Sequence, residues 1–403
     1  MLLIKGKTHD IYIKGDRIID ITEKTSETEE GQGGLGTPKS PRLKMTVLDA
    51  TKLIVAPGLV DMHVHFREPG FKYKEDIQTG AAAAVAGGFT TCCCMPNTLP
   101  VADCEKIIKM ITGKALQTPI CVLPIGAVTI GQKGERLTNF AALKRAGVVA
   151  LSDDGMPIID DVVMRKALIK AAKNDMLLIS HCEREGPMVA RDIRLAAETD
   201  TRVHIAHVST AVAVRAIRSA KKKGVNVTAE VAPHHFSLTR DMVSTKDTNA
   251  KMSPPLRRQK DVDAIIEGLS DGTIDAIATD HAPHSIEEKT LPFYRAPNGI
   301  IGLETSLAVT LTFLYHTGKL TMEKIISLMS TNPAKLLNLD AGRLKIGSIA
   351  DLVIFDPNEE WTVDPTLFKS KSRNTPYDGM KLKGKVKYTI SHGKIIYKGG
   401  GYA

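Results

Sequence analysis

The sequence predicts an α/β protein: a TIM-type (β/α)8 barrel with a small β-sandwich that both ends of the chain build together. Short apolar runs rich in β-branched residues alternate eight times with helix-like stretches, over roughly 280 residues, which suits a closed eight-stranded barrel. Strand-like segments with glycine turns lie outside this region, at residues 11–21, 47–55, 342–356 and 385–400. The simplest arrangement brings these outer strands together beside the barrel.

Each of the eight apolar runs is short enough to be one buried strand of a parallel sheet. The runs lie at residues 53–66, 89–97, 119–128, 148–155, 176–183, 202–209, 225–235 and 273–284. Helix-like stretches between them include residues 75–86, 161–173 and 211–223. A doubly wound open sheet is the alternative, but no GxGxxG motif follows an early strand.

We therefore expect three segments. Residues 1–55 form the N-terminal part of the sandwich, residues 56–338 the barrel, and residues 339–403 the C-terminal part of the sandwich. Residues 25–41 are rich in Gly, Glu, Ser and Pro, which predicts a flexible surface loop within the first segment.

Composition narrows the class of function. The chain has 403 residues and a net charge of +9, with Lys and Arg scattered along it, so we expect no nucleic-acid partner. No apolar run is long enough for a membrane span and the start lacks signal-peptide features, which predicts a cytoplasmic protein. Six cysteines without zinc-finger spacing do not form a disulfide scaffold, and residues 92–94 are expected to be buried on a strand.

Polar residues that can bind metals close almost every predicted strand. In a (β/α)8 barrel the carboxyl ends of the strands form the active-site face, so these residues should meet there. They are His63, His65, Asn97, Asp153, Asp154, His181, His207, His234, His235 and Asp280.

The spacing of these residues indicates a metal site. His63 and His65 are two residues apart on a strand, so their imidazoles point to the same side and can bind one ion. With His181, His207, Asp280 and one aspartate at 153–154, the set exceeds what one zinc needs. Nitrogen and oxygen ligands favour Zn²⁺, and we expect one or two ions per chain, with two favoured. Such a pair lowers the pKa of bound water to about 7 and polarises a carbonyl.

Several strings resemble the signatures of the dihydroorotases among the cyclic amidohydrolases, over nearly the whole chain apart from residues 25–41. They are PGLVDMHVHFREPG at 57–70, MPNT at 95–98, SDDG at 152–155, SHCE at 180–183, AHVST at 206–210, PHH at 233–235, TDHAPH at 279–284 and GLETS at 302–306. The resemblance implies reversible cyclisation of N-carbamoyl-L-aspartate to L-dihydroorotate plus water, the third step of de novo pyrimidine synthesis. The positive charge of the chain suits such a small anionic substrate.

The resemblance also implies roles for the metal-binding residues. His63, His65 and Asp280 would hold one metal, and His181 and His207 the second. Many amidohydrolases bridge the metals with a carboxylated lysine at strand four, where this chain has SDDG. The spacing to His181 in the relatives that use aspartate favours Asp154 over Asp153 as the bridge. Asp280 would also move a proton from the attacking water to the departing amide nitrogen.

Arg67 follows the histidine pair, and its planar guanidinium matches a substrate carboxylate. The resemblance completes the substrate-binding set with Asn97, Ser253, His284, Asn298 and Gly299. Ser253 and Asn298 stand where relatives carry Asn and an aromatic residue. Three other histidines are expected to have structural or supporting roles, with the first turned to the opposite face of its strand from His207: His204, His234 and His235.

Two alternative functions stay open. Another cyclic amidohydrolase (allantoinase, hydantoinase or dihydropyrimidinase) would share the histidine pair, but Arg67 and the aspartates at strand four favour a dihydroorotase. A non-catalytic scaffold of the same fold would be expected to lose metal ligands, which this chain retains. The resemblance also leaves open a homo-oligomer and association with aspartate transcarbamoylase.

Overall fold

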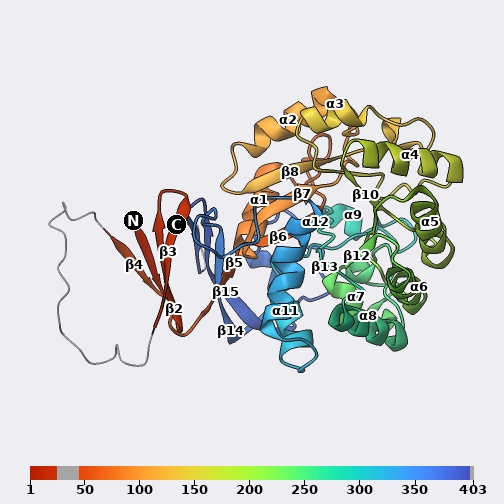
Figure 1. The fold of residues 1–403 in the computed structure, drawn as a ribbon. Coiled ribbons are helices and arrows are strands. Elements are labelled where there is room, and N and C mark those ends of the chain that lie inside the picture. Colours follow the sequence, from red (N-terminus) through yellow and green to blue (C-terminus); the bar gives the residue numbers. More distant parts are fainter. Residues whose placement is uncertain (25–44, 400–403) are drawn as a thin grey trace, which may run out of the picture.

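The computed structural model describes residues 1–24 and 45–399 (Figure 1). The loop predicted at residues 25–41 lies outside the described residues. The described chain forms one eight-stranded sheet and two four-stranded sheets. In Figure 1 the smaller sheets stand together at one side of the barrel.

The eight-stranded sheet is the predicted parallel barrel. Its strands are β6 (Leu59–Val64), β7 (Phe89–Cys94), β8 (Cys121–Gly126), β9 (Ala150–Ser152), β10 (Leu177–Ser180), β11 (Val203–Ile205), β12 (Val227–Val231) and β13 (Ala276–Ile277). They neighbour one another in chain order, and a parallel bridge between Val64 and His281 brings the last strand end back to the first. The fold class expected from the sequence is confirmed.

The helices are α1 (Ile77–Ala86), α2 (Glu105–Ala115), α3 (Phe140–Arg145), α4 (Asp161–Lys173), α5 (Glu185–Thr199), α6 (Ala211–Lys222), α7 (Pro233–Ser237), α8 (Gln259–Asp271), α9 (Ile286–Lys289), α10 (Ser306–Thr310), α11 (Met322–Ile326) and α12 (Asn332–Leu336). In Figure 1 the longer ones, such as α2, α4, α5, α6 and α8, lie around the outside of the barrel. The short helical turns are η1 (Ile130–Gln132), η2 (Arg240–Met242), η3 (Thr248–Ala250), η4 (Leu311–Tyr315), η5 (Ser327–Thr331) and η6 (Pro365–Leu367). Several helices begin at a side chain that accepts from the first turn, as Asp160 does for α4 and Thr210 for α6.

The first apolar run, residues 53–66, is not a single strand. It divides into β5 (Ile54–Pro57), which pairs with the C-terminal sheet, and β6 of the barrel. Gly58 separates them, at a point where a Cβ atom would lie 2.2 Å from Thr90 Oγ1. Only glycine fits this close approach, so the chain changes sheets there.

Strands from both ends of the chain build the sandwich. One sheet has the order β3-β2-β1-β4 and the other β16-β15-β14-β5. The strands are β1 (Leu2–Lys5), β2 (His9–Lys14), β3 (Arg17–Glu23), β4 (Thr46–Asp49), β14 (Leu352–Thr362), β15 (Lys381–Ser391) and β16 (Lys394–Lys398). Side chains from both sheets share one apolar core, which joins Ile4 and Ile13 to Leu352 and Ile390. The domain boundaries at 55/56 and 338/339 stay predictions.

Two smaller expectations concern burial and membranes. Cys92, Cys93 and Cys94 are buried on β7, as expected. Within residues 1–24 and 45–399, no helix is long and apolar enough to cross a bilayer.

Candidate metal centre

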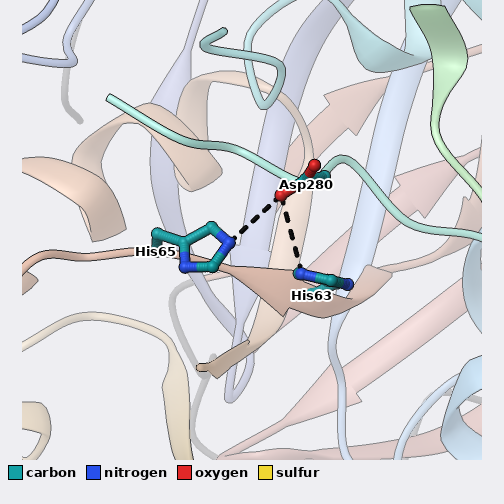
Figure 2. A group of neighbouring side chains, drawn as sticks. All are labelled: His63, His65 and Asp280. Atoms are coloured by element: carbon teal, nitrogen blue, oxygen red, sulfur yellow. Dashed lines mark hydrogen bonds and ion pairs between the residues drawn. The ribbon is translucent and has the colours of Figure 1, made fainter. Parts of the chain in front are cut away.

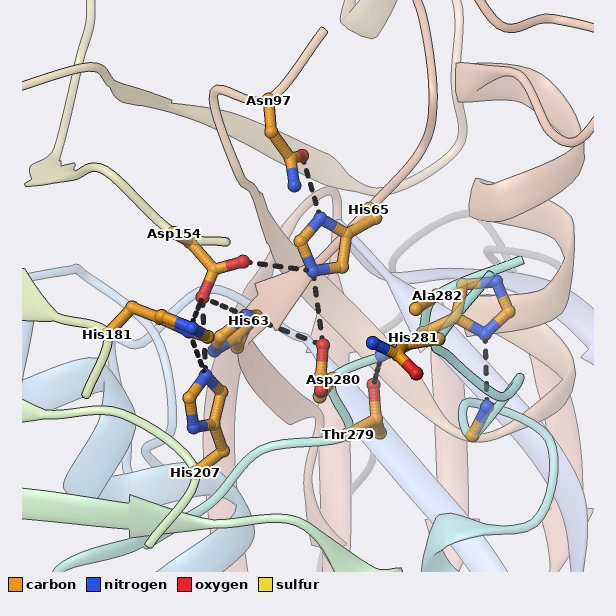
Figure 3. Close-up of polar contacts among 12 residues, drawn as sticks. His63, His65, Asn97, Asp154, His181, His207, Thr279, Asp280, His281 and Ala282 are labelled. Carbon is orange, nitrogen blue, oxygen red and sulfur yellow. Dashed lines mark hydrogen bonds and ion pairs between the residues drawn. The ribbon is translucent and has the colours of Figure 1, made fainter. Parts of the chain in front are cut away.

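Six of the predicted strand-end residues lie together at the carboxyl ends of the barrel strands (Figure 3). The ligand atoms of His63, His65 and Asp280 all lie within 4.8 Å of one another. Figure 2 shows both imidazoles turned toward the Asp280 carboxylate. A second group, His63, Asp154 and His207, meets the same limit. All of these side chains are buried, so the barrel holds them out of bulk water.

Asp154 lies between the four imidazoles. Its Oδ1 is 3.2 Å from His181 Nδ1, 3.3 Å from His207 Nε2 and 3.4 Å from His63 Nε2. Its Oδ2 is 3.4 Å from His65 Nε2. One carboxylate therefore contacts both pairs of histidines, one oxygen reaching three rings and the other oxygen the fourth.

Asp153 points elsewhere. Its Oδ1 accepts hydrogen bonds from the backbone of Val128 (2.8 Å) and Thr129 (3.2 Å), and its Oδ2 accepts from the Thr129 hydroxyl. Burial raises the pKa of Asp153 to about 6, although these hydrogen bonds oppose the rise. Asp153 thus holds the loop after β8, and only its neighbour reaches the imidazoles.

His63 on β6 and His65 just after it each turn one imidazole nitrogen toward this centre. His63 Nδ1 lies 2.6 Å from Glu230 Oε1, so its Nε2 is the nitrogen that faces the carboxylates. That Nε2 is buried without a hydrogen-bond partner, 3.4 Å from Asp154 and 3.6 Å from Asp280. Two carboxylates that face one imidazole nitrogen require positive charge between them, from a proton or from a metal ion.

His65 repeats this arrangement. Its Nδ1 lies 2.9 Å from Asn97 Oδ1, which turns Nε2 toward the centre, 3.1 Å from Asp280 Oδ1. The side chains thus offer imidazole nitrogens and carboxylate oxygens to one shared space, with hydrogen-bond partners behind the rings. This donor set fits a divalent metal.

Electrostatics keep the carboxylates ionised. Burial alone would raise the pKa of Asp154 and Asp280, but the surrounding histidines outweigh it and hold both pKa values well below the usual range. Burial disfavours the charged form of His63, yet Asp154 and Glu230 raise its pKa. The carboxylates and the surrounding histidines thus attract one another strongly, as expected for a site that binds positive charge.

The backbone at the centre adopts an unusual conformation. Arg67, His207 and Asp280 have φ values of 56°, 31° and 48°, in the left-handed region that favours glycine. Such strain persists only where the surroundings enforce it. Here the Asp61 carboxylate accepts from the backbone of His63 at 3.0 Å and of Thr279 at 3.2 Å, which ties β6 to the residues before Asp280.

Asp61 and Glu230, both buried inside the barrel, were not predicted from the sequence. Two signals could have found them. Asp61 precedes the histidine pair at the same two-residue spacing, and Glu230 is a charged residue inside an apolar run. His204, for which a structural or supporting role is expected, places its Nε2 3.3 Å from Glu230 Oε2, and the other oxygen of that carboxylate contacts His63.

Arg67 and His284 lie together beside the centre. Arg67 Nε donates to the Pro283 carbonyl at 3.1 Å, and its guanidinium lies 3.3 Å from His284 Nε2. His284 Nε2–H donates to the Asn298 carbonyl at 2.8 Å. Burial lowers the pKa of Arg67 to about 10 and that of His284 to about 3, so the guanidinium is charged and the imidazole neutral at pH 7.

The remaining predicted residues lie on the loops around this pair. Gly299 has a φ of 132°, and a Cβ there would lie 2.7 Å from Ala282. Ser253 belongs to the loop that follows η3 and is partly buried. His234 and His235 are buried in α7, and burial lowers the pKa of His234 to about 4, so it is neutral.

Sequence comparison places the chain among known proteins. The amidohydrolase family matches residues 54–396. The dihydroorotase of Caldanaerobacter subterraneus subsp. tengcongensis is 49% identical over 380 residues, covering 87% of this chain and 88% of that protein. The dihydroorotase of Geobacter metallireducens is 46% identical over 426 aligned residues, covering 99% of both chains.

Solved structures agree in fold. An L-hydantoinase (dihydropyrimidinase) from Arthrobacter aurescens has a TM-score of 0.86 at 24% identity, covering 100% of this chain and 97% of that one. A D-hydantoinase has a TM-score of 0.87 at 22% identity, covering 100% and 96%. Likeness at this identity shows the shared fold, whereas the sequence relatives show the family. The chain therefore belongs to the amidohydrolase family and, within it, to the dihydroorotases, metal-dependent enzymes that hydrolyse a cyclic amide.

Proposed function

We propose that this chain interconverts N-carbamoyl-L-aspartate and L-dihydroorotate at the six-residue centre, with Arg67 binding the substrate carboxylate. The observation that carries the proposal is the position of Asp154 among four buried imidazoles, with a charged guanidinium nearby. A pair of cations would balance the carboxylates that face the imidazole nitrogens, and an anionic ring would pair with the guanidinium.

The metal ligands in this proposal divide into two groups with a shared bridge. His63, His65 and Asp280 would hold one ion, His181 and His207 would hold the other, and Asp154 would contribute to both. Zinc is the proposed metal, because the ligands are nitrogen and oxygen without thiolate. Two ions per chain are proposed, because six ligands exceed what one zinc needs. When bound, the metals supply Lewis acidity toward the amide carbonyl and lower the pKa of water at the site.

Asp280 is the proposed proton carrier. Its Oδ1 faces His63 and His65, whereas its Oδ2 makes no hydrogen bond with any residue in the described part of the chain. In the hydrolytic direction, Oδ2 accepts a proton from the attacking water and delivers it to the departing ring nitrogen. The water oxygen ends in the new carboxylate. In the reverse direction, Oδ2 of Asp280 takes the proton back from the nitrogen and gives it to the oxygen that leaves as water.

Arg67 and the residues beside it are proposed to orient the substrate. The guanidinium offers two parallel N–H donors to the ring carboxylate, which matches the charge of dihydroorotate and not that of a neutral ring. Asn97, Ser253, His284, Asn298 and Gly299 are the proposed remaining contacts. Asn97 would act twice, because its oxygen already orients His65 and its amide N–H groups stay available.

Association with other chains stays a prediction, as does a cytoplasmic location. A homo-oligomer or a complex with aspartate transcarbamoylase would appear in sedimentation of the purified chain, alone and mixed with that enzyme.

The direct test is a substrate panel on the purified chain. We expect hydrolysis of dihydroorotate and little turnover of hydantoin, dihydrouracil or allantoin. Arg67→Gln should lower kcat/KM for dihydroorotate by about 10- to 100-fold, the loss of one or two hydrogen bonds to a charged group. Faster turnover of an uncharged ring than of dihydroorotate would contradict the proposal. So would an Arg67→Gln chain that hydrolyses dihydroorotate as well as the parent.

A further inference from the structure

Lys289 is a buried lysine that the proposed reaction does not use. It ends α9, and its Nζ donates to the backbone carbonyls of Lys251 (3.3 Å), Pro297 (3.2 Å) and Gly299 (3.1 Å). Within residues 1–24 and 45–399, no carboxylate lies within ion-pair distance of it. Burying an ammonium group without a counter-ion costs free energy, so its place here needs a reason beyond stability.

The charge of this lysine suits the three carbonyls. Burial lowers the pKa of Lys289 to about 8, and the charge of Lys251 adds to the lowering while Asp247 opposes it. The side chain is therefore mostly protonated at neutral pH, with three N–H donors and no acceptor. Three carbonyl oxygens from two separate segments satisfy those donors.

Two of these carbonyls belong to one short segment, residues 297–299, in which every carbonyl accepts from a distant side chain. Pro297 O accepts from Lys289, and Asn298 O from His284 Nε2. Gly299 O accepts from both Lys289 and Asn374 Nδ2, the latter at 3.0 Å. The Gly299 amide also donates to the Lys251 carbonyl at 3.0 Å. The backbone of residues 297–299 is thus fixed on every side.

This segment fixes the residues beside the guanidinium of Arg67. Its middle carbonyl holds the imidazole of His284, which lies 3.3 Å from that guanidinium. The exposed side chain of Asn298 makes no hydrogen bond with any described residue. A shift of residues 297–299 would therefore move His284 and Asn298 relative to Arg67.

We propose that Lys289 is a positioning residue: it holds residues 297–299 so that His284 and Asn298 stand ready for the anionic substrate. The expected change in KM rests on the proposed function, whereas the role of Lys289 in holding residues 297–299 does not. Pre-organised contacts of this kind are expected to favour substrate binding more than the chemical step.

A neutral side chain of similar length separates this role from a purely structural one. In Lys289→Met, Lys251 O keeps the Gly299 amide and Gly299 O keeps Asn374, so only Pro297 O loses its one described partner. The variant also loses a buried charge that lacks a counter-ion. We therefore expect a melting temperature close to that of the parent, together with a looser segment 297–299.

Kinetics give the first readout. Lys289→Met should raise KM for dihydroorotate about tenfold or more while kcat changes by less than about threefold. Lys289→Arg, which keeps the charge and its donors, should give an intermediate KM. The control is Lys221→Met, because Lys221 also donates to a backbone carbonyl, that of Gly272, but pairs with Asp275 and lies away from residues 297–299. Its KM should equal that of the parent.

Hydrogen–deuterium exchange gives a second readout that needs no substrate. Peptides covering residues 290–302 should exchange about tenfold faster in Lys289→Met, while those covering α4 stay unchanged. Unchanged exchange at 290–302 would overturn the proposal, as would a lowered melting temperature with an unchanged KM. A chain that fails to hydrolyse dihydroorotate would overturn the proposed function, and the exchange data would still decide whether Lys289 holds the segment.

Discussion

Two adjacent aspartates give a sharp test of the metal centre, because their surroundings differ completely. Asp154→Asn removes a carboxylate whose oxygens lie 3.2 to 3.4 Å from four imidazole nitrogens. A unit charge 4 Å away in a partly shielded protein site is worth about 4 kcal/mol. Loss of this charge should therefore weaken metal binding by at least about 10³-fold.

The same change at Asp153 should spare the metals. Asparagine keeps one oxygen to accept from the backbone of Val128 and Thr129, and the Thr129 hydroxyl can turn to accept from the new amide. We expect Asp153→Asn to cost at most about 1 to 2 kcal/mol of folding free energy.

The amount of zinc bound per chain shows which of the two aspartates binds the metals. Each variant is dialysed against a weak chelator, its zinc is measured by elemental analysis, and thermal unfolding checks the fold. Asp154→Asn should lose zinc and stay folded, and Asp153→Asn should keep it. The reverse result, or equal loss in both folded variants, would refute the assignment of the bridge.

Three further predictions follow from single contacts. Glu230→Gln should weaken metal binding about 10- to 100-fold, measured by chelator competition, because His63 loses its anionic partner. Burial raises the pKa of Glu304 to about 7 from an ordinary 4.5, so the folded state binds the extra proton. Its contribution to stability should fall as pH rises from 4.5 to 7, by about 3 kcal/mol at most, and Glu304→Gln should make the measured slope shallower in denaturant unfolding. Gly299→Ala forces a Cβ to within 2.7 Å of Ala282 at a φ of 132°. This variant should raise KM for dihydroorotate several-fold with a small loss of melting temperature. An unchanged KM would contradict this prediction.

The sequence was sufficient to predict the fold because its pattern of strands and helices repeats. Eight alternations of apolar run and helix leave few arrangements, and the carboxyl ends of parallel strands must then share one face. The division of the first run at Gly58 was not visible, because both halves are apolar and strand-like. It depends on the approach of Thr90, a contact that the local pattern does not encode.

Other features of the site depend on packing between distant segments. Which of Asp153 and Asp154 faces the imidazoles is set by the loop after β8, where Val128 and Thr129 bind the first carboxylate. Lys289 ends a short acidic helix whose sequence is typical of an exposed surface. Its burial comes from segments around residues 251 and 297–299, which only the folded chain brings together.

The central claim is that a metal pair at the six-residue centre supports turnover of dihydroorotate. The most direct measurement combines zinc analysis with dihydroorotate absorbance on the same sample, before chelation, after chelation and after zinc is restored. We predict about two zinc ions per chain, loss of turnover with the metal, and recovery when zinc returns. Turnover that persists in a chain stripped of metal would contradict the account.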